Sequence, residues 1–276
     1  MAATAEALDL DTIQATINYH LDTGVMPWTF TGGPGSTERR STGQQDPHVM
    51  TIHNGRPHIA EFALETHGFH FIRHDTKMKD FYDEAEIKRV YYPEMEELMK
   101  KESGSKRVIV FDHTVRLADE SVREAKKLRE PVLRAHNDYT EWSAPQRVRD
   151  LVPDEADELL KRRFAIIQVW RPINKPVETD PLGICDARTI EFTDGVVSER
   201  RYPGRVGQTY AMKYNPKHKW YWFPRMRRDE ALVFKVFESL KDGRARWTAH
   251  SAFKDPTSPP NAAPRESIEI RTIAFF

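Results

Sequence analysis

The chain has 276 residues, and its 42 Lys and Arg residues balance 42 Asp and Glu residues, so the formal net charge at pH 7 is zero. This balance argues against a general surface for nucleic acid or anionic membrane, because both need an excess of basic side chains. Cys185 is the single cysteine, which excludes disulfide frameworks and leaves His and carboxylates as ligands for any metal. No apolar run approaches the ~20 residues that span a bilayer and no secretory signal is seen, so we expect a cytoplasmic protein.

The first half of the chain predicts strands and then helices. An Asn54-Gly55 dipeptide predicts a β-hairpin near residues 48–60, inside an N-terminal extension over residues 1–65. Residues 68–73 alternate like a half-buried strand, and residues 79–103 show helical periodicity with a new first turn at Pro93. Short strands are expected at residues 107–112 and 132–136.

The second half predicts mainly short strands. Its acids and bases predict a helix over residues 153–162, and the apolar run at 164–170 predicts a central strand. Further strands are expected at about 182–193, 196–202, 208–214, 219–223, 245–253 and 266–276. Residues 230–240 fit helix or strand, and their acidic start favours helix. We therefore expect one mixed α and β, β-rich domain over residues 1–276, with helices packed outside the strands.

A His-x-Asp motif at residues 136–138 is the first candidate for chemistry. Side chains two apart on a strand face the same way, so His136 and Asp138 can bind one metal ion, and His250, 114 residues after His136, is the candidate third ligand. Two His and one carboxylate leave positions open for a co-substrate and O₂, as in non-haem Fe(II) oxygenases. The motif is weak alone, since a second copy occurs at His20-Leu21-Asp22 and a structural histidine is the commoner explanation of either.

The C-terminal segment strengthens the later copy. Arg265, Ser267, Glu269 and Arg271 share one face of a predicted strand. A guanidinium binds a carboxylate through two parallel hydrogen bonds, and a neighbouring serine can add a third. The alternative is that Arg265 or Arg271 simply pairs with Glu269 at the surface.

Four other residues are further candidates for the site. Trp170 and Arg171 end a predicted buried strand, where Arg171 either clamps a substrate or co-substrate carboxylate or pairs with an acid. His113 either lines the pocket or is a hydrogen-bonded core histidine. Tyr139 directly follows Asp138 and is expected beside the metal site.

Several blocks of the chain resemble the 2-oxoglutarate-dependent Fe(II) oxygenases of the double-stranded β-helix (jelly-roll) class. The nearest resemblance is to the group that includes gibberellin desaturase-like proteins, AsaB-type hydroxylase/desaturases and the cephalosporin methoxylase component. The blocks run from about residue 70 to the C-terminus and are Tyr91–Glu96, Val110–Arg116, His136–Thr140, Val169–Pro172, His218–Pro224 and His250–Phe253.

The resemblance implies a fold, a reaction and residue roles. It implies Fe(II) bound by His136, Asp138 and His250, with 2-oxoglutarate and O₂ as co-substrates. Arg265 and Ser267 would hold the distal carboxylate of 2-oxoglutarate, and Arg271 would contact it too. Gln168 departs from the group, in which Asn precedes Val-Trp-Arg. The implied reaction is hydroxylation, desaturation or cyclisation of a small molecule of secondary metabolism.

Two other functions stay open at this stage. One is a jelly-roll protein that binds a ligand without turnover. The other is a nucleic-acid or protein demethylase with the same iron chemistry, which the balanced charge disfavours. The substrate, the outcome of the reaction and the formation of a homo-oligomer are not determined by the sequence.

Overall fold

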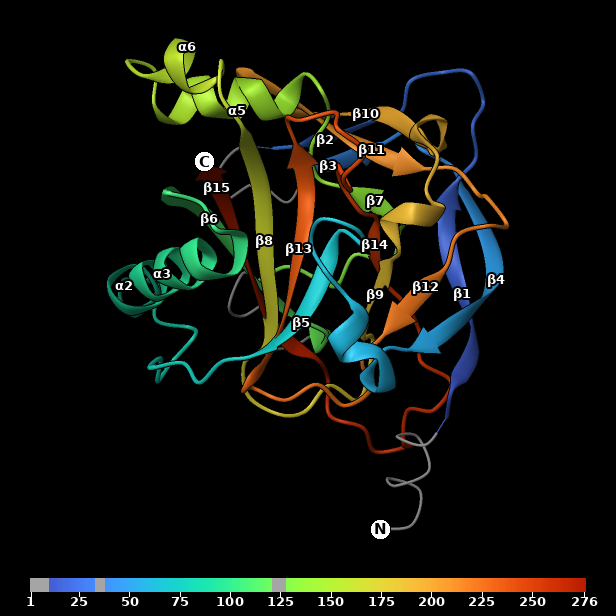
Figure 1. Cartoon of the computed structure of the whole chain (residues 1–276). Helices are drawn as coiled ribbons and strands as arrows, with labels where there is room; N and C mark the ends of the chain where they lie inside the picture. The colour runs from blue at the N-terminus through green and yellow to red at the C-terminus, as the bar shows by residue number, and fades with distance from the viewer. Residues whose placement is uncertain (1–9, 33–37, 121–127) are drawn as a thin grey trace.

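The computed structural model describes residues 10–32, 38–120 and 128–276, and their strands form two sheets (Figure 1). The larger sheet has ten strands in the order β1-β4-β12-β9-β14-β7-β11-β10-β2-β3, and the smaller has five in the order β5-β13-β8-β15-β6. The strands are β1 (Thr12–His20), β2 (Trp28–Thr31), β3 (Arg39–Ser41), β4 (Gln45–Asn54), β5 (Phe69–Arg73), β6 (Arg107–Leu117), β7 (His136–Asn137), β8 (Phe164–Pro172), β9 (Leu182–Cys185), β10 (Gly195–Tyr202), β11 (Arg205–Met212), β12 (Trp220–Trp222), β13 (Glu230–Glu238), β14 (His250–Ala252) and β15 (Glu266–Phe275).

The chain passes back and forth between the two sheets. Strands β6 to β9 alternate between them, and β13 to β15 do so again. The resulting neighbours β9, β14, β7 and β11 pair antiparallel in the larger sheet, as β13, β8, β15 and β6 do in the smaller one. This winding is the jelly-roll, or double-stranded β-helix, and it confirms the predicted fold class.

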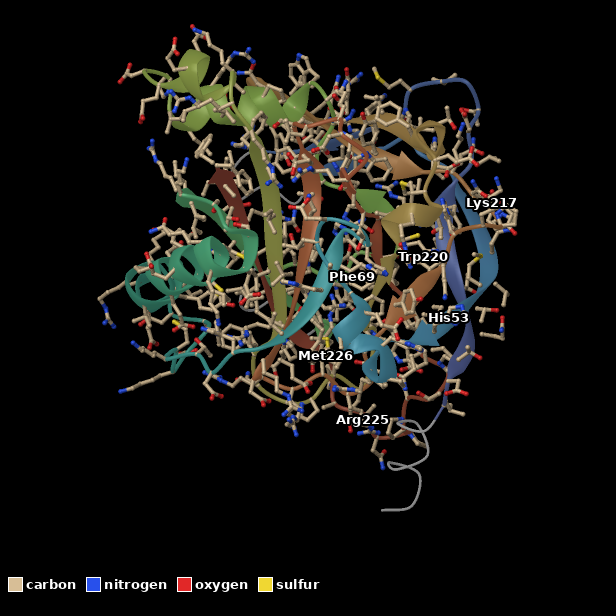
Figure 2. The ribbon with its side chains drawn as sticks, in the orientation of Figure 1. His53, Phe69, Lys217, Trp220, Arg225 and Met226 are labelled. Atoms are coloured by element: carbon tan, nitrogen blue, oxygen red, sulfur yellow. The ribbon has the colours of Figure 1, made fainter. Side chains whose placement is uncertain are left out.

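One apolar cluster fills the space between the sheets, and another lies outside the smaller sheet. Phe69, Trp170 and Phe234 belong to the inner cluster, together with Ile184 from the larger sheet. Figure 2 shows Phe69 and Trp220 among the strands, and Lys217 at the edge of the molecule. Both aromatic side chains are fully buried.

The fully buried Phe69 gives a stability prediction. Phe69→Ala is expected to lower the free energy of unfolding by about 3–5 kcal/mol, because a cavity replaces the ring in a closely packed interior. Urea unfolding followed by circular dichroism measures the change. Val49→Ala is the control, since Val49 is 69% exposed, and it should change the free energy by less than about 0.5 kcal/mol. Equal effects of the two changes would contradict the packing described.

Helices cover the outer face of the smaller sheet. The segment comprises α2 (Glu84–Glu86), the π-helical η2 (Ile87–Tyr91) and α3 (Tyr92–Ser103), which confirms the predicted helical region from residue 84 onward. Met95 and Met99 of α3 pack in the outer cluster with Ile167 and Ile270. None of the helices in the described ranges is both long and apolar enough to cross a bilayer.

Residues 230–238 correct the predicted helix at 230–240, because they form strand β13 between β5 and β8. All nine residues are buried: Leu232 and Phe234 face the inner cluster, and Ala231 and Val233 face the outer one. A strand buried on both faces loses the alternation that identifies strands in a sequence, and a short apolar run is then ambiguous.

The hairpin predicted at residues 48–60 is also wrong. Strand β4 pairs with β1 and β12, and Asn54-Gly55 leads into a 3₁₀ helix, η1 (Arg56–Glu61). The Asn54 side chain accepts a hydrogen bond from the Arg56 amide at 3.0 Å, while Arg56 forms a bidentate pair with Glu230 at 3.0 and 2.8 Å. Tertiary contacts therefore replace the expected turn.

The remaining differences concern element lengths. The predicted helix at 153–162 is the single turn α6 (Ala156–Leu159), and a longer helix, α5 (Ser143–Leu151), was not predicted. The strands predicted at 132–136 and 245–253 correspond to the much shorter β7 and β14, at residues 136–137 and 250–252. Two shorter 3₁₀ turns, η3 (Ala187–Thr189) and η4 (Phe192–Asp194), follow β9.

Candidate metal centre

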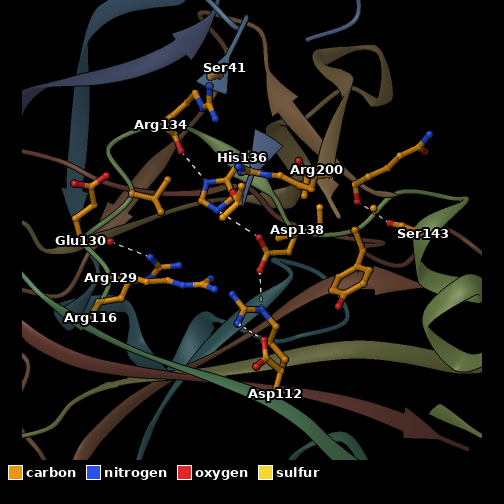
Figure 3. A pocket seen from close by; sticks show the side chains of 18 of the residues that line it. Ser41, Asp112, Arg116, Arg129, Glu130, Arg134, His136, Asp138, Ser143 and Arg200 are labelled. Atoms are coloured by element: carbon orange, nitrogen blue, oxygen red, sulfur yellow. Dashed lines mark hydrogen bonds and ion pairs between the residues drawn. The ribbon is translucent and has the colours of Figure 1, made fainter. Parts of the chain in front are cut away.

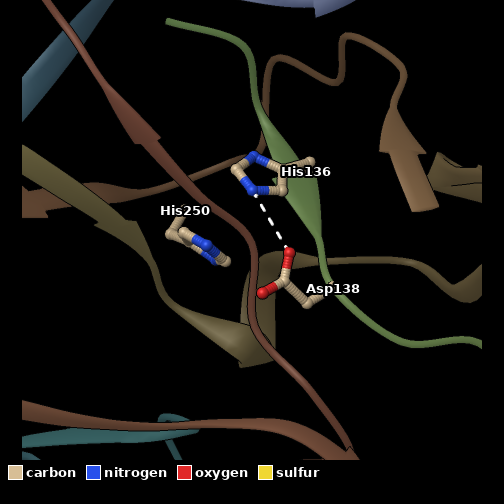
Figure 4. A group of neighbouring side chains, drawn as sticks. All are labelled: His136, Asp138 and His250. Carbon is tan, nitrogen blue, oxygen red and sulfur yellow. Dashed lines mark ion pairs between the residues drawn. The ribbon is translucent and has the colours of Figure 1, made fainter. Parts of the chain in front are cut away.

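Strands β7 and β14 are neighbours, and their pairing brings the three predicted ligands together. His250 lies opposite His136 in the ladder, and their ring centroids are 4.2 Å apart. Asp138 follows β7 and turns its carboxylate to the same point (Figure 4). One ligand atom from each of His136, Asp138 and His250 lies within 4.8 Å of the other two.

Each histidine is held in a form suited to metal binding. His136 Nδ1 lies 2.7 Å from the Arg134 carbonyl oxygen and donates to it, which leaves Nε2 directed at Asp138 Oδ1, 3.4 Å away. Burial, reinforced by the neighbouring His136, lowers the pKa of His250 far below its ordinary value, so the ring is neutral. Its Nδ1 is buried without a hydrogen-bond partner in the described residues. Neutral imidazole is the metal-binding form, so these side chains fit Fe(II).

Asp138 is fixed by two donors on its second oxygen. Oδ2 accepts hydrogen bonds from Gln168 Nε2 at 2.7 Å and Arg271 Nε at 3.2 Å, so Oδ1 is left facing the histidines. Burial by itself would raise the pKa of Asp138, but the Arg271 charge and the hydrogen bond with His136 hold it well below the ordinary range. The carboxylate is therefore ionised, as a metal ligand must be.

In the sequence, Gln168 stands out only as a departure from the related group. In the structure it lies on β8 opposite Arg271 of β15, fully buried, and both reach Asp138. The pairing of β8 with β15 decides this contact, so no local signal in the sequence identifies it. Its position supports a role in orienting the carboxylate of Asp138.

Gln168→Ala is therefore expected to weaken Fe(II) binding by about 10–100-fold, the range for residues that orient a metal ligand. Competition with a coloured chelator under anaerobic conditions measures the affinity. Gln14→Ala is a matched control, because the Gln14 amide makes an exposed hydrogen bond to Thr51 Oγ1 at 2.8 Å. Unchanged affinity in Gln168→Ala would mean that Arg271 alone positions Asp138.

Arg265 and Ser267 bring unpaired polar atoms into the interior. Arg265 is 2% exposed; its Nη1 donates to the Asp180 carbonyl, and its guanidinium lies 5.6 Å from the Trp170 ring centroid. Arg265 Nε and Ser267 Oγ are buried and have no partner in the part of the chain that the structure describes. Burial, together with Arg116, lowers the pKa of Arg265 to about 9. A buried guanidinium with an unpaired N–H, next to an unpaired serine hydroxyl, fits the carboxylate of a bound co-substrate.

Arg271 differs from Arg265 because carboxylates already surround it. Besides Asp138, it contacts Asp112 at 3.1 Å and Thr114 Oγ1 at 2.9 Å, and it forms an ion pair with Glu269. The three acids raise its pKa against the effect of burial. Its nitrogens are thus committed to protein groups.

The other predicted residues divide between two faces of the smaller sheet. Tyr139 lines the cavity over the metal centre, and Trp170 belongs to the inner cluster. Arg171 faces outward, where it donates to the His74 carbonyl and lies 5.9 Å from the Tyr91 ring centroid. Neighbours on a strand point to opposite faces, so the structure does not bring Arg171 to the site.

His113 does not line the cavity and corresponds to the structural alternative, a hydrogen-bonded histidine. Its Nδ1 is 2.8 Å from Tyr92 Oη, and its Nε2 is 3.0 Å from Glu84 Oε2, so it contacts the helical layer. The twin motif at His20 lies at the end of β1 and is not part of the metal-ligand group found among the described residues.

A cavity of about 1080 Å³ opens over the metal centre (Figure 3). His136, Asp138, Tyr139 and Arg271 form part of its lining. A site of this size can accept a drug-sized small molecule next to the ligands.

Comparisons with known proteins agree with this geometry. A family model described as an oxidoreductase/YMDC permease-like domain matches residues 17–275. The hydroxylase/desaturase efuI of Hormonema carpetanum is 32% identical over 294 residues, which cover 98% of this chain and 97% of the relative. The Fe(II)/2-oxoglutarate-dependent dioxygenase nvfI of Aspergillus novofumigatus is 31% identical over 255 residues, 90% of both chains. The chain belongs to this family of iron- and 2-oxoglutarate-dependent dioxygenases.

Solved structures place the dioxygenase in the same fold. A variant of the iron and alpha-ketoglutarate-dependent endoperoxidase NvfI aligns with a TM-score of 0.86 at 27% identity, covering 97% of this chain and 98% of that chain. Another relative, the hydroxylase/desaturase CTB9 of Cercospora beticola, is 34% identical over 253 residues, 84% of this chain and 77% of its own. The resemblance seen in the sequence is thereby confirmed.

Proposed function

We propose that the chain oxidises a small natural-product-like molecule with Fe(II), 2-oxoglutarate and O₂, and that His136, Asp138 and His250 bind the iron. The observation that carries this proposal is the convergence of the three ligand atoms within 4.8 Å beside a large cavity. When bound, Fe(II) supplies the redox chemistry that couples decarboxylation of 2-oxoglutarate to succinate with oxidation of a substrate C–H bond.

Arg265 and Ser267 are the proposed anchor for the distal carboxylate of 2-oxoglutarate. Both are buried and retain unpaired polar atoms in the described part of the chain, whereas the nitrogens of Arg271 contact Asp112, Asp138 and Glu269. Arg271 and Gln168 instead hold Asp138 Oδ2, so that Oδ1 stays directed at the histidines. The ring of Phe234, from the inner cluster, lies 4.9 Å from the His250 ring, centroid to centroid, and excludes water from that side of the metal centre.

Anaerobic titration with Fe(II) and then 2-oxoglutarate tests this assignment. The expected result is a weak visible charge-transfer band that saturates at one iron and one 2-oxoglutarate per chain. Succinate release with O₂ and a panel of small acids, terpenoids and polyketides then identifies substrates. Absence of the band in iron-loaded protein would show that the three residues do not form the proposed centre.

The mass of the product separates hydroxylation from the other two outcomes, and its NMR spectrum then distinguishes a new double bond from a new ring. Gain of one oxygen atom indicates hydroxylation, and loss of two hydrogen atoms indicates desaturation or ring closure. The relatives named above include hydroxylase/desaturases and an endoperoxidase, so gain of two oxygen atoms is also to be sought. The proposal covers all of these because the same iron centre serves each reaction.

A further inference from the structure

The cavity over the metal centre is basic, although the chain as a whole is neutral. Eight Arg and Lys side chains but six Asp and Glu side chains line it in the described part of the structure. Several of these charges are already neutralised: Arg271 pairs with Asp112 and Asp138, and Lys254 pairs with Asp180 at 2.7 Å. The other lining arginines are therefore the candidates for binding an anionic ligand.

Four lining arginines form no ion pair within the described residues. Arg205 lies 4.9 Å from the Tyr202 ring centroid, and the other three, Arg116, Arg129 and Arg147, are called the arginine cluster. Arg116 lies on β6 opposite Ser267 and donates from Nη1 to the Glu130 carbonyl at 2.9 Å. Arg129 is bridged to Arg116 through the backbone. Figure 3 shows both side chains extending toward the metal centre.

The positive charges of Arg116 and Arg129 repel each other, and burial further destabilises the charged form of Arg116. Burial lowers the pKa of Arg116; the charges of Glu269 and Asp138 oppose this effect, and those of Arg271 and Arg129 add to it. An anion between the guanidinium groups would relieve this repulsion and satisfy their donors.

Arg147 extends the cluster along α5. Its guanidinium lies 5.4 Å from the Phe111 ring centroid, and its Nε is buried without a partner among the described residues. Stacking on an aromatic ring holds a guanidinium in place, and Nε of Arg147 stays available to a ligand.

The same cavity has apolar side chains at its surface. Trp142 is 50% exposed and Val206 is 48% exposed, and both line the cavity. Exposed large apolar groups beside an anion site fit a ligand with a hydrophobic body.

We propose that the substrate is an organic acid with an apolar body, whose carboxylate is bound by the arginine cluster while the body packs on Trp142 and Val206. The inference rests on the proposed function, because it concerns the substrate of that site. The carboxylate of 2-oxoglutarate has the same chemistry, so the test must distinguish the two sources.

The test uses iron- and 2-oxoglutarate-loaded protein under anaerobic conditions and isothermal titration calorimetry. Two probe pairs are compared: decanoate with decanamide, and 2-naphthoate with 2-naphthamide. Each acid should bind at least about tenfold more tightly than its neutral amide, since hydrogen bonds to charged groups are the stronger ones. Added salt should weaken binding of the acids alone.

Single-residue variants then locate the anion site. Arg129→Ala and Arg147→Ala should each lower the affinity for the acids by about tenfold and leave the amides and the Kd of 2-oxoglutarate unchanged. Arg149→Ala is the matched control, because Arg149 lies two positions along α5, is exposed and does not line the cavity.

Four outcomes would overturn the inference. The first is that neither acid binds more tightly than its amide, and the second is that the variants weaken the binding of acid and amide equally. The third is that the variants weaken the binding of 2-oxoglutarate alone, which would assign the cluster to the co-substrate, and the fourth is that every affinity stays unchanged. Loss of the visible band in unmodified protein is a separate result, because it contradicts the iron site rather than the charge of the substrate.

Discussion

Replacing His136 with alanine is expected to abolish the visible band that Fe(II) and 2-oxoglutarate produce together, and to lower succinate release by more than about 100-fold. The reason is that His136, Asp138 and His250 are the proposed complete protein ligand set, with ligand atoms within 4.8 Å. Changing a residue that only orients a ligand costs about 10–100-fold, so loss of a ligand should exceed that range. Anaerobic absorption spectra and metal content measure the first effect.

The second His-x-Asp motif supplies the control for this experiment. His20→Gln removes the histidine of a sequence-identical pattern that lies outside the metal-ligand group of the described residues. It should leave the band and the iron content unchanged, with circular dichroism verifying the fold. A normal band in His136→Ala, or its loss in His20→Gln alone, would contradict the assignment.

Replacing Arg265 with alanine is expected to raise the Kd of 2-oxoglutarate by about 100-fold while iron remains bound. Each hydrogen bond to a charged group is worth about 1.5–3 kcal/mol, and a guanidinium can form two with one carboxylate. Arg265→Lys should recover only part of the affinity, because an ammonium keeps the charge but loses the planar fork. Titration of the visible band with 2-oxoglutarate gives the Kd.

Arg271→Gln distinguishes the two candidate anchors. Arg271 contacts Asp138 Oδ2, so this change should weaken Fe(II) binding more than it weakens 2-oxoglutarate binding to the iron-loaded protein. The opposite pattern, with Arg271→Gln raising the Kd of 2-oxoglutarate and Arg265→Ala leaving it unchanged, would reverse the assignment. Thermal unfolding of both variants shows whether either change simply destabilises the fold, since Arg265 is buried and the Arg271 side chain is only 12% exposed.

The comparison of β15 with β13 shows when a strand can be read from its sequence. In residues 265–271, charged or polar residues alternate with Ile268 and Ile270, and the structure has this strand with the isoleucines in the outer cluster. In β13 both faces are buried, so no alternation remains, and the acidic start of the segment favours a helix instead. Local patterns carry information only where one face of an element differs from the other.

The net charge of the chain does not indicate whether a local binding site is charged. A total of zero argues against a generally basic surface, but it does not describe how charges are distributed. Folding gathers Arg116, Arg129 and Arg147 from separate segments around one cavity. A neutral composition is therefore compatible with a basic binding site.

The sequence by itself determined the ligand types, the order of the motifs and the β-rich class of the fold, because these follow from residue chemistry and from short-range periodicity. Only the tertiary structure decided which of two identical His-x-Asp patterns meets His250, since that depends on the pairing of β7 with β14. It also placed Gln168 on Asp138 and turned Arg171 and His113 away from the cavity. Contacts between strands distant in sequence depend on register, and a shift of one residue reverses the face of every side chain.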